Sequence, residues 1–224
     1  MTDRVILFDV IETLFSLRPL KDRFEALGVP PETADLFFAQ LLRDAFALSA
    51  AGEFRPFPEI ARGTLEVLLE SQGVAATEET VSKVLSVFGA LPAHSDVQPA
   101  LEQAHRSGAR VVLLTNGSRS NTEQLVADAG LSRLVDDVIS VEDIQLWKPQ
   151  PGLYREACAR CGVAPEHATL VAAHAWDVHG AMRAGLHGVW VRRQDHHYHP
   201  AMGEPLGLAA SLPEAVDLVL SHPA

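Results

Sequence analysis

The sequence has few basic residues for its length, only two cysteines and no long hydrophobic run. No apolar segment is long enough to span a bilayer, and the N-terminus shows no basic region followed by a signal-type apolar stretch. We therefore expect a cytoplasmic protein. The 18 lysine and arginine residues stand against 29 acidic ones, which gives a formal net charge of −11. This excess of acid argues against a nucleic acid or an anionic membrane as partner, but a local site can still bind a small anionic substrate.

The two cysteines, Cys158 and Cys161, have the C-x-x-C spacing of redox motifs and half zinc sites. No second pair exists to complete a zinc site, and the surrounding residues 154–161 have the pattern of a helix that ends at Gly162. We interpret both cysteines as small hydrophobic side chains of that helix. The cluster His196-His197-Tyr198-His199 lacks a neighbouring acidic or cysteine ligand at a recurring spacing, so we interpret it as an exposed loop.

The composition is that of a globular protein with one domain, or one domain with an insertion. The chain has 224 residues, of which 47% are hydrophobic and 21% charged. From Asp96 onward, strand-like apolar runs alternate with helical patterns. The predicted strands cover residues 109–115, 137–141, 169–172 and 188–191, and the predicted helices cover 120–129, 151–161, 178–184 and 212–220. This alternation predicts a parallel sheet that is covered on both faces.

A helical block separates the first strand, residues 5–8, from this alternating region. Apolar residues recur there at helical spacing, namely Leu36, Phe37, Leu41, Ala45 and Leu48, and two further helical patterns cover about residues 59–71 and 78–88. We predict a Rossmann-like α/β core of residues 1–15 and 93–224 with an inserted helical cap domain of residues 16–92. An insertion at the carboxyl ends of the strands is well placed to close over a ligand.

Asp9 directly follows the first apolar run, and Thr13 follows four positions later. An acid at the carboxyl end of a buried parallel strand lies where open α/β sheets bind their ligands. It is costly to desolvate there without a partner. The alternative interpretation is an aspartate that caps the next turn.

Three further polar groups each follow a predicted strand. Residues 115–118, Thr-Asn-Gly-Ser, offer several hydrogen-bond donors to an oxyanion, and Ser118 or Ser120 can also cap the next helix. Lys148, between a tryptophan and a proline, would keep a nearby aspartate ionised and nucleophilic; taken alone, it suits a solvated loop. Asp177 follows the strand at 169–172, where a helix cap is the alternative. The occurrence of these four groups in this order, each after an apolar strand, indicates a shared site much more strongly than any one of them alone.

The order of these groups along the chain resembles the haloacid dehalogenase superfamily, and the resemblance covers nearly the whole chain. It implies that Asp9 is the nucleophile, and it implies these further catalytic residues: Thr13, Thr115, Asn116, Lys148 and Asp177. Within the superfamily, the segment at residues 175–181, together with Tyr154 after Lys148-Pro149, looks like the L-2-haloacid dehalogenases.

This resemblance also implies a reaction. Asp9 would displace the halide from carbon and form an ester, which a water positioned by Asp177 and Asn116 would hydrolyse. Lys148 would hold the charge of Asp9, and the two threonines, with backbone amides, would orient it. No metal cofactor would be required.

Two positions separate a dehalogenase from a phosphatase of the same superfamily. Superfamily phosphatases resemble one another in a second acid, two residues after the nucleophile, that protonates the leaving group. Here that residue is Ile11, which cannot transfer a proton. The extra fourth-motif acid that helps to hold magnesium is replaced by Ala172, which weakens a hard-cation site. A halide leaves as a stable anion and needs no general acid. The alternative is an Mg²⁺-dependent small-molecule phosphatase with Asp9 and Asp177 as metal ligands.

Several departures from the dehalogenase pattern bear on the substrate. The dehalogenases resemble one another in an arginine of the cap that binds the substrate carboxylate, and Phe38 stands at that position here. Arg43 is the nearest arginine downstream and lies on another face of the helix. His174 replaces an asparagine, Ala172 replaces a serine, and Glu12 stands where glycine is usual. The predicted substrate-binding residues are Ile11, Phe38, Arg43, Tyr154, His174 and Trp176. These departures leave a third alternative, a catalytically silent binding protein of the same fold; a homodimer is also left open.

Overall fold

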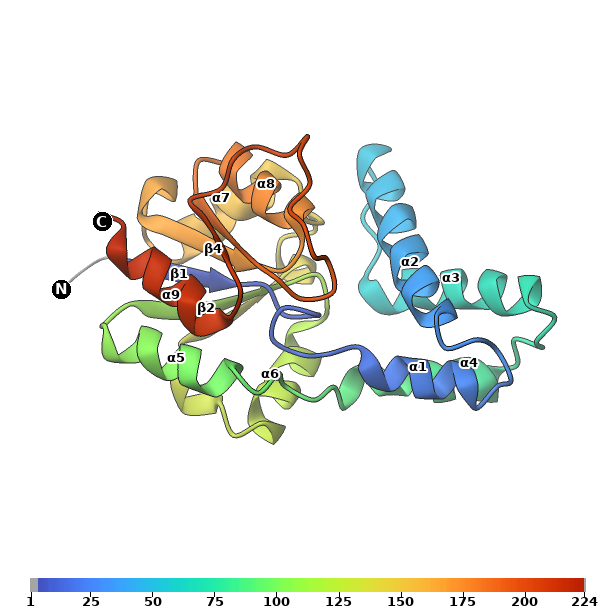
Figure 1. Cartoon of the computed structure of the whole chain (residues 1–224). Coiled ribbons are helices and arrows are strands. Elements are labelled where there is room, and N and C mark those ends of the chain that lie inside the picture. The colour runs from blue at the N-terminus through green and yellow to red at the C-terminus, as the bar shows by residue number, and fades with distance from the viewer. Residues whose placement is uncertain (1–3, 224) are drawn as a thin grey trace.

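The computed structural model describes residues 4–223 and has an α/β fold built on one six-stranded sheet. All neighbouring strands pair in parallel, in the order β3-β2-β1-β4-β5-β6 (Figure 1). The strands are β1 Val5–Phe8, β2 Arg110–Thr115, β3 Asp137–Ser140, β4 Ala168–Ala172, β5 His187–Val191 and β6 Gly207–Ala209. The strand order reverses at β1 and β4, and the carboxyl ends of strands at such a reversal form the usual ligand site of open α/β sheets.

Helices cover both faces of the sheet, which explains why the strand sequences are apolar without alternation. Val5 and Leu7 of β1 pack with one pair of helices, α7 Pro151–Arg160 and α8 Ala175–Arg183. Ile6 and Phe8 pack on the other face with α5 Val97–Arg106, α6 Arg119–Asp128 and α9 Leu212–Ser221. The core is therefore a three-layer structure with β1 buried at its centre.

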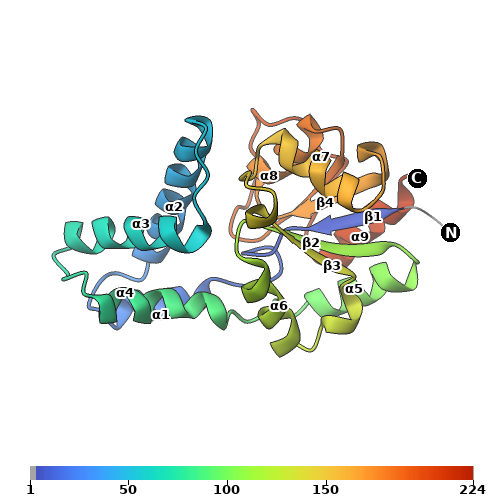
Figure 2. The same ribbon diagram turned by 180° about the vertical axis from the view of Figure 1, so that it is seen from behind.

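The insertion between β1 and α5 is helical and lies beside the carboxyl ends of the strands (Figures 1 and 2). Its helices are α1 Arg18–Glu25, α2 Thr33–Ala50, α3 Phe57–Ser71 and α4 Glu78–Leu85. The two segments that join it to the core run side by side. Phe15 and Ala93 form an antiparallel bridge, and the backbone N–H of Ser16 donates to the carbonyl of Pro92 at 2.9 Å. The limits of the cap at residues 16 and 92 stay a prediction.

The predicted parallel sheet and helical insertion are both confirmed, with corrections to individual elements. α1, α5 and the three-residue edge strand β6 were not expected from the sequence pattern. α8 begins at Ala175, three residues earlier than expected, and α4 ends at Leu85, followed by a 3₁₀ turn. Leu36 lies on the periodic pattern of α2 but is 46% exposed, so the buried face of that helix is narrower than its apolar residues suggest.

The two cysteines and the histidine cluster at residues 196–199 have the environments that the sequence predicts. Cys158 and Cys161 are buried free thiols, and burial raises the pKa of Cys158 to about 12, so it stays protonated. The three histidines between residues 196 and 199 are exposed. Within residues 4–223, no helix is long and apolar enough to cross a bilayer.

Candidate active site

The carboxyl ends of β1 and β4 bring the predicted catalytic residues together. Asp9 is the first residue after β1, and its backbone N–H donates to the carbonyl of Val171 in β4 at 3.0 Å. This pairing holds the loop of Asp9 against the loop that carries His174 and Asp177 into α8. Lys148 arrives from the connection between β3 and α7.

The side chain of Asp9 is 8% exposed, and each oxygen of its carboxylate has a partner. Lys148 Nζ donates to Oδ1 at 2.8 Å, and Thr13 Oγ1 donates to Oδ2 at 2.6 Å. His174 Nδ1 lies 3.2 Å from the same Oδ2. Burial opposes ionisation of Asp9, but Lys148 and His174 outweigh it and hold the pKa of Asp9 well below its usual value. Asp9 is therefore a carboxylate at neutral pH, as a nucleophile must be.

Lys148 is fully buried between two carboxylates. Besides Asp9 it donates to Asp177 Oδ2 at 2.7 Å, and Asp177 Oδ1 accepts a 2.5 Å hydrogen bond from the hydroxyl of Tyr154. Burial and the charge of Asp9 raise the pKa of Asp177, although Lys148 opposes that rise. The interpretation of Asp177 as a simple helix cap is wrong, because α8 begins at Ala175 and the side chain of Asp177 faces Lys148 instead.

Thr13 links Asp9 to the loop after β4. Its hydroxyl donates to Asp9 and accepts from the backbone N–H of Ala173 at 2.9 Å. The carbonyl of Ala173 in turn accepts from Trp190 Nε1 at 2.7 Å. This chain of hydrogen bonds fixes the loop that carries His174 relative to Asp9.

Thr115 and Asn116 lie beside Asp9, but their side chains bond to backbone groups and not to its carboxylate. Thr115 Oγ1 accepts from the backbone N–H of Gly117 at 2.9 Å, and no hydrogen bond joins it to Asp9 in the part of the chain that the structure describes. Asn116 Oδ1 accepts from the backbone N–H of Lys148 at 3.1 Å. Asn116 therefore positions the lysine, and the prediction that Thr115 orients Asp9 gains no support from the hydrogen bonds.

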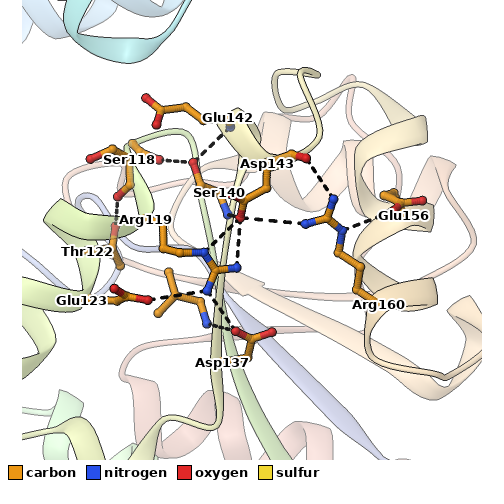
Figure 3. Close-up of polar contacts among 12 residues, drawn as sticks. Ser118, Arg119, Thr122, Glu123, Asp137, Ser140, Glu142, Asp143, Glu156 and Arg160 are labelled. Carbon is orange, nitrogen blue, oxygen red and sulfur yellow. Dashed lines mark hydrogen bonds and ion pairs between the residues drawn. The ribbon is translucent and has the colours of Figure 1, made fainter.

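A second polar network holds the loop of residues 115–118, which follows β2 (Figure 3). Ser118 caps α6, as the sequence indicated, by accepting from the N–H of Asn121 at 3.3 Å. Ser140, at the end of β3, donates to the carbonyl of Gly117 at 2.7 Å. Arg119 reaches from α6 to Asp143 at 3.0 Å and ties the ends of β2 and β3 together.

A cavity of about 20 Å³ lies directly over Asp9. Its apolar wall comes mainly from the insertion and its polar wall from the core; it is lined by Asp9, Ile11, Phe38, Leu42, Phe57, Thr115, Asn116, Gly117, His174 and Trp176. Aromatic rings pack along one side. The ring of His174 stacks on Trp176 with centroids 5.1 Å apart, and Phe46 of α2 meets the same tryptophan edge-on at 5.0 Å.

The structure does not bring all the predicted substrate-binding residues to this cavity. Ile11, Phe38, His174 and Trp176 line it. Tyr154 is fully buried behind Asp177. The side chain of Arg43 is 65% exposed, forms an ion pair with Asp44 at 2.7 Å and lies away from the cavity.

Glu12 occupies a strained backbone position three residues after Asp9. Its φ of 65° lies in the left-handed region, which glycine adopts at little cost and other residues rarely do. Its buried carboxylate accepts from the backbone N–H of Leu17, and its carbonyl accepts from His94 Nε2 at 3.2 Å. Burial raises the pKa of Glu12. These bonds give Glu12 a structural part at the start of the insertion.

Gly180 sits where the Tyr154–Asp177 contact leaves no room for a side chain. A Cβ there would lie 2.6 Å from the Cβ of Pro149 and 2.9 Å from the hydroxyl of Tyr154. We expect Gly180→Ala to lower the free energy of unfolding by about 1–3 kcal/mol, measured by urea denaturation. The matched control is Gly63→Ala, where a Cβ meets nothing within 4 Å. Alanine should be neutral or stabilising there. Equal stability of the two variants would contradict the packing argument.

The family profile described as a haloacid dehalogenase-like hydrolase matches residues 4–185. The chain belongs to the haloacid dehalogenase-like hydrolases. It is 26% identical over 192 residues to (S)-2-haloacid dehalogenase 1 of Pseudomonas sp. (strain CBS-3), with 85% of each chain covered. It is 25% identical over 211 residues to a Pseudomonas putida (S)-2-haloacid dehalogenase, with 93% of each covered.

The fold of this haloacid dehalogenase-like hydrolase also matches solved structures. L-2-haloacid dehalogenase from Xanthobacter autotrophicus, with chloropropionic acid covalently bound, superposes with a TM-score of 0.90 at 21% identity. The match covers 98% of this chain and 99% of that one. At this identity the match supports the shared fold alone.

The donor set of this hydrolase does not fit magnesium. Lys148 Nζ pairs with both Asp9 and Asp177, and the second oxygen of Asp177 accepts from Tyr154, so neither oxygen of Asp177 is free to bind a cation. Ile11 and Ala172 supply no oxygen ligand from their side chains. Across residues 4–223, no three His, Cys, Asp or Glu side chains group to hold a metal ion. Magnesium requires near-octahedral oxygen coordination, so we derive no step through it.

Three residues that the sequence did not reveal complete the support of the site. Arg193 donates to the carbonyl of Thr13 at 3.1 Å and pairs with Asp96 at 2.8 Å. Trp190 holds Ala173, as described above. Arg193, Asp96 and Trp190 contact residues that are distant in the sequence. They belong to no local motif, so the sequence does not indicate their roles.

Proposed function

We propose that this hydrolase cleaves carbon–halogen bonds of small 2-haloacids by covalent catalysis. Its similarity to (S)-2-haloacid dehalogenases supports this choice of substrate class. The observation that carries the proposal is the buried Asp9–Lys148–Asp177 cluster below a cavity with an apolar wall. Lys148, together with His174, keeps Asp9 ionised in a poorly solvated site. A poorly solvated carboxylate is a strong nucleophile toward carbon.

The first step requires only groups that lie at the cavity. A carboxylate oxygen of Asp9 forms a bond to the halogen-bearing carbon while the carbon–halogen bond breaks and the halide leaves with the bonding electron pair. The side chain of Ile11 faces this cavity and cannot donate a proton, which suits a leaving group that needs none. The product of the step is an ester on Asp9 and a free halide.

Metal dependence separates this proposal from the phosphatase alternative. We expect the purified protein to release halide from 2-chloropropionate at the same rate after chelation and after added magnesium, because Lys148 already bridges the two carboxylates. Halide and phosphate release should be measured in parallel on both substrate classes. Phosphate release that rises strongly with magnesium would favour the phosphatase, and the absence of both activities would favour a silent binding protein.

The exposed position of Arg43 leads to a second expectation. Its side chain is 65% exposed and paired with Asp44, so Arg43→Ala should leave kcat and KM for 2-chloropropionate within about twofold of wild type. The measurement is steady-state halide release. A large rise in KM for Arg43→Ala would show that the arginine reaches the substrate carboxylate when the cap closes differently.

A further inference from the structure

Asp177 is poorly placed to activate the water that must hydrolyse an ester on Asp9. Its side chain is fully buried, and both oxygens already accept hydrogen bonds, one from Lys148 and one from Tyr154. It does not line the cavity over Asp9. A base needs hydrogen-bond reach to the water that it deprotonates. Asp177 therefore serves to hold Lys148 in place.

His174 has the position that Asp177 lacks. Its Nδ1 lies 3.2 Å from Asp9 Oδ2, so it reaches the atoms that react, and its side chain is 15% exposed. Stacking on Trp176 at 5.1 Å, with Phe38 at 6.2 Å, fixes the plane of the ring. The residue is also the N-cap of α8, so its backbone is held as well.

His174 also lies in the wall of two cavities. It lines both the small cavity over Asp9 and a neighbouring one of about 180 Å³, which has Glu12 and Arg193 in its wall. The larger cavity has room for several water molecules, whereas the cavity over Asp9 holds about one. Water in either cavity therefore lies within reach of the imidazole side chain that lines both.

We propose that His174 is the general base that activates water against the Asp9 ester. This inference rests on the proposed function. His174 Nδ1 takes a proton from the water, and the resulting hydroxide forms a bond to Cγ of Asp9. The bond between Cγ and the ester oxygen then breaks, and the leaving alkoxide takes the proton from His174 to give the 2-hydroxy acid. Asp9, left as a carboxylic acid, loses its proton to solvent and the carboxylate is restored.

The charge of Asp9 makes this role depend on the stage of the reaction. In the resting enzyme burial lowers the pKa of His174, but the hydrogen bond and charge of Asp9 outweigh it and raise that pKa, with Asp177 adding to the rise and Lys148 opposing it. Ester formation removes the negative charge of Asp9. The pKa of His174 then falls, and the neutral imidazole becomes available as a base at the step that needs one.

The test compares a single turnover with steady-state turnover in the full-length protein. His174→Gln keeps a side chain that can hydrogen-bond to Asp9 but cannot accept a proton from water, and His174→Ala removes both properties. His105→Gln, an exposed histidine of α5, is the matched control, and Asp9→Asn is the negative control for ester formation. Each protein is mixed with excess 2-chloropropionate, and halide release and intact mass are followed together. Circular dichroism checks that each variant is folded.

We expect both His174 variants to release about one halide per protein in a burst and then to stall. Steady-state turnover should fall by roughly 10²–10⁴-fold, and the protein mass should increase by the alkyl group on Asp9. The His105→Gln control should turn over as wild type does and carry no ester.

Three results would overturn the proposal. Steady-state turnover within about threefold of wild type in His174→Gln would show that another group activates the water. Loss of the burst in proportion to the loss of turnover, with no ester, would place His174 in alkylation or substrate binding instead, while the proposed function stands. No halide release and no ester in the wild-type protein would remove the proposed function and this inference together.

Discussion

Asp9→Asn is expected to abolish halide release, lowering turnover by at least about 10³-fold. The carboxamide has the shape of the carboxylate but is a far weaker nucleophile, so the ester cannot form. The measurement is halide release from 2-chloropropionate together with the intact mass before and after incubation. The mass before incubation also verifies that the amide has not been hydrolysed back to aspartate.

The asparagine variant should remain folded. Lys148 keeps its ion pair with Asp177, and the asparagine carbonyl can still accept from Thr13. A thermal unfolding midpoint within a few degrees of wild type would support this expectation. Turnover retained near the wild-type rate would show that another residue is the nucleophile.

Lys148→Met is expected to cost about 3–5 kcal/mol of unfolding free energy as well as activity. The lysine is fully buried and is the shared cation of two carboxylates, so its removal leaves buried negative charge without a partner. Methionine roughly preserves the volume, so the effect reports charge more than packing. Urea denaturation at neutral pH measures the loss.

The matched control is Lys21→Met, which breaks the surface ion pair between Lys21 and Asp35 at 2.8 Å. Both of those side chains are more than a third exposed, so the cost should stay below about 1 kcal/mol. Adding Asp177→Asn to Lys148→Met should recover part of the lost stability, because one uncompensated charge is removed. Equal costs for Lys148→Met and Lys21→Met would contradict the buried-cluster argument.

The meeting of Asp9, Lys148 and Asp177 could be predicted from the sequence because of a property of parallel sheets. Each residue follows an apolar run, and the carboxyl ends of parallel strands share one edge, so chain order alone predicts their proximity. The helical insertion was predictable for a similar reason, since a long stretch with helical periodicity and no strand pattern interrupts the strand–helix alternation.

The remaining features depend on contacts that chain order does not encode. β6 is too short to show a pattern, and Leu36 is apolar yet exposed because the neighbouring helices cover only part of α2. Tyr154 points behind Asp177 rather than toward substrate, a difference of side-chain direction that its spacing from Lys148 cannot reveal. The contact of His174 with Asp9 likewise depends on how the loop after β4 turns.

The water-sized cavity over Asp9 has a consequence for the timing of turnover. Phe38 and Leu42 of α2 and Phe57 of α3 form one wall of this cavity, so we expect a haloacid to reach Asp9 when α2 and α3 swing away from the core. The same swing must recur before the hydroxy acid can leave. We expect the frequency of this motion to limit kcat. Turnover of a substrate with fast chemistry should therefore slow as solvent viscosity rises, whereas turnover of a substrate with slow chemistry should not change.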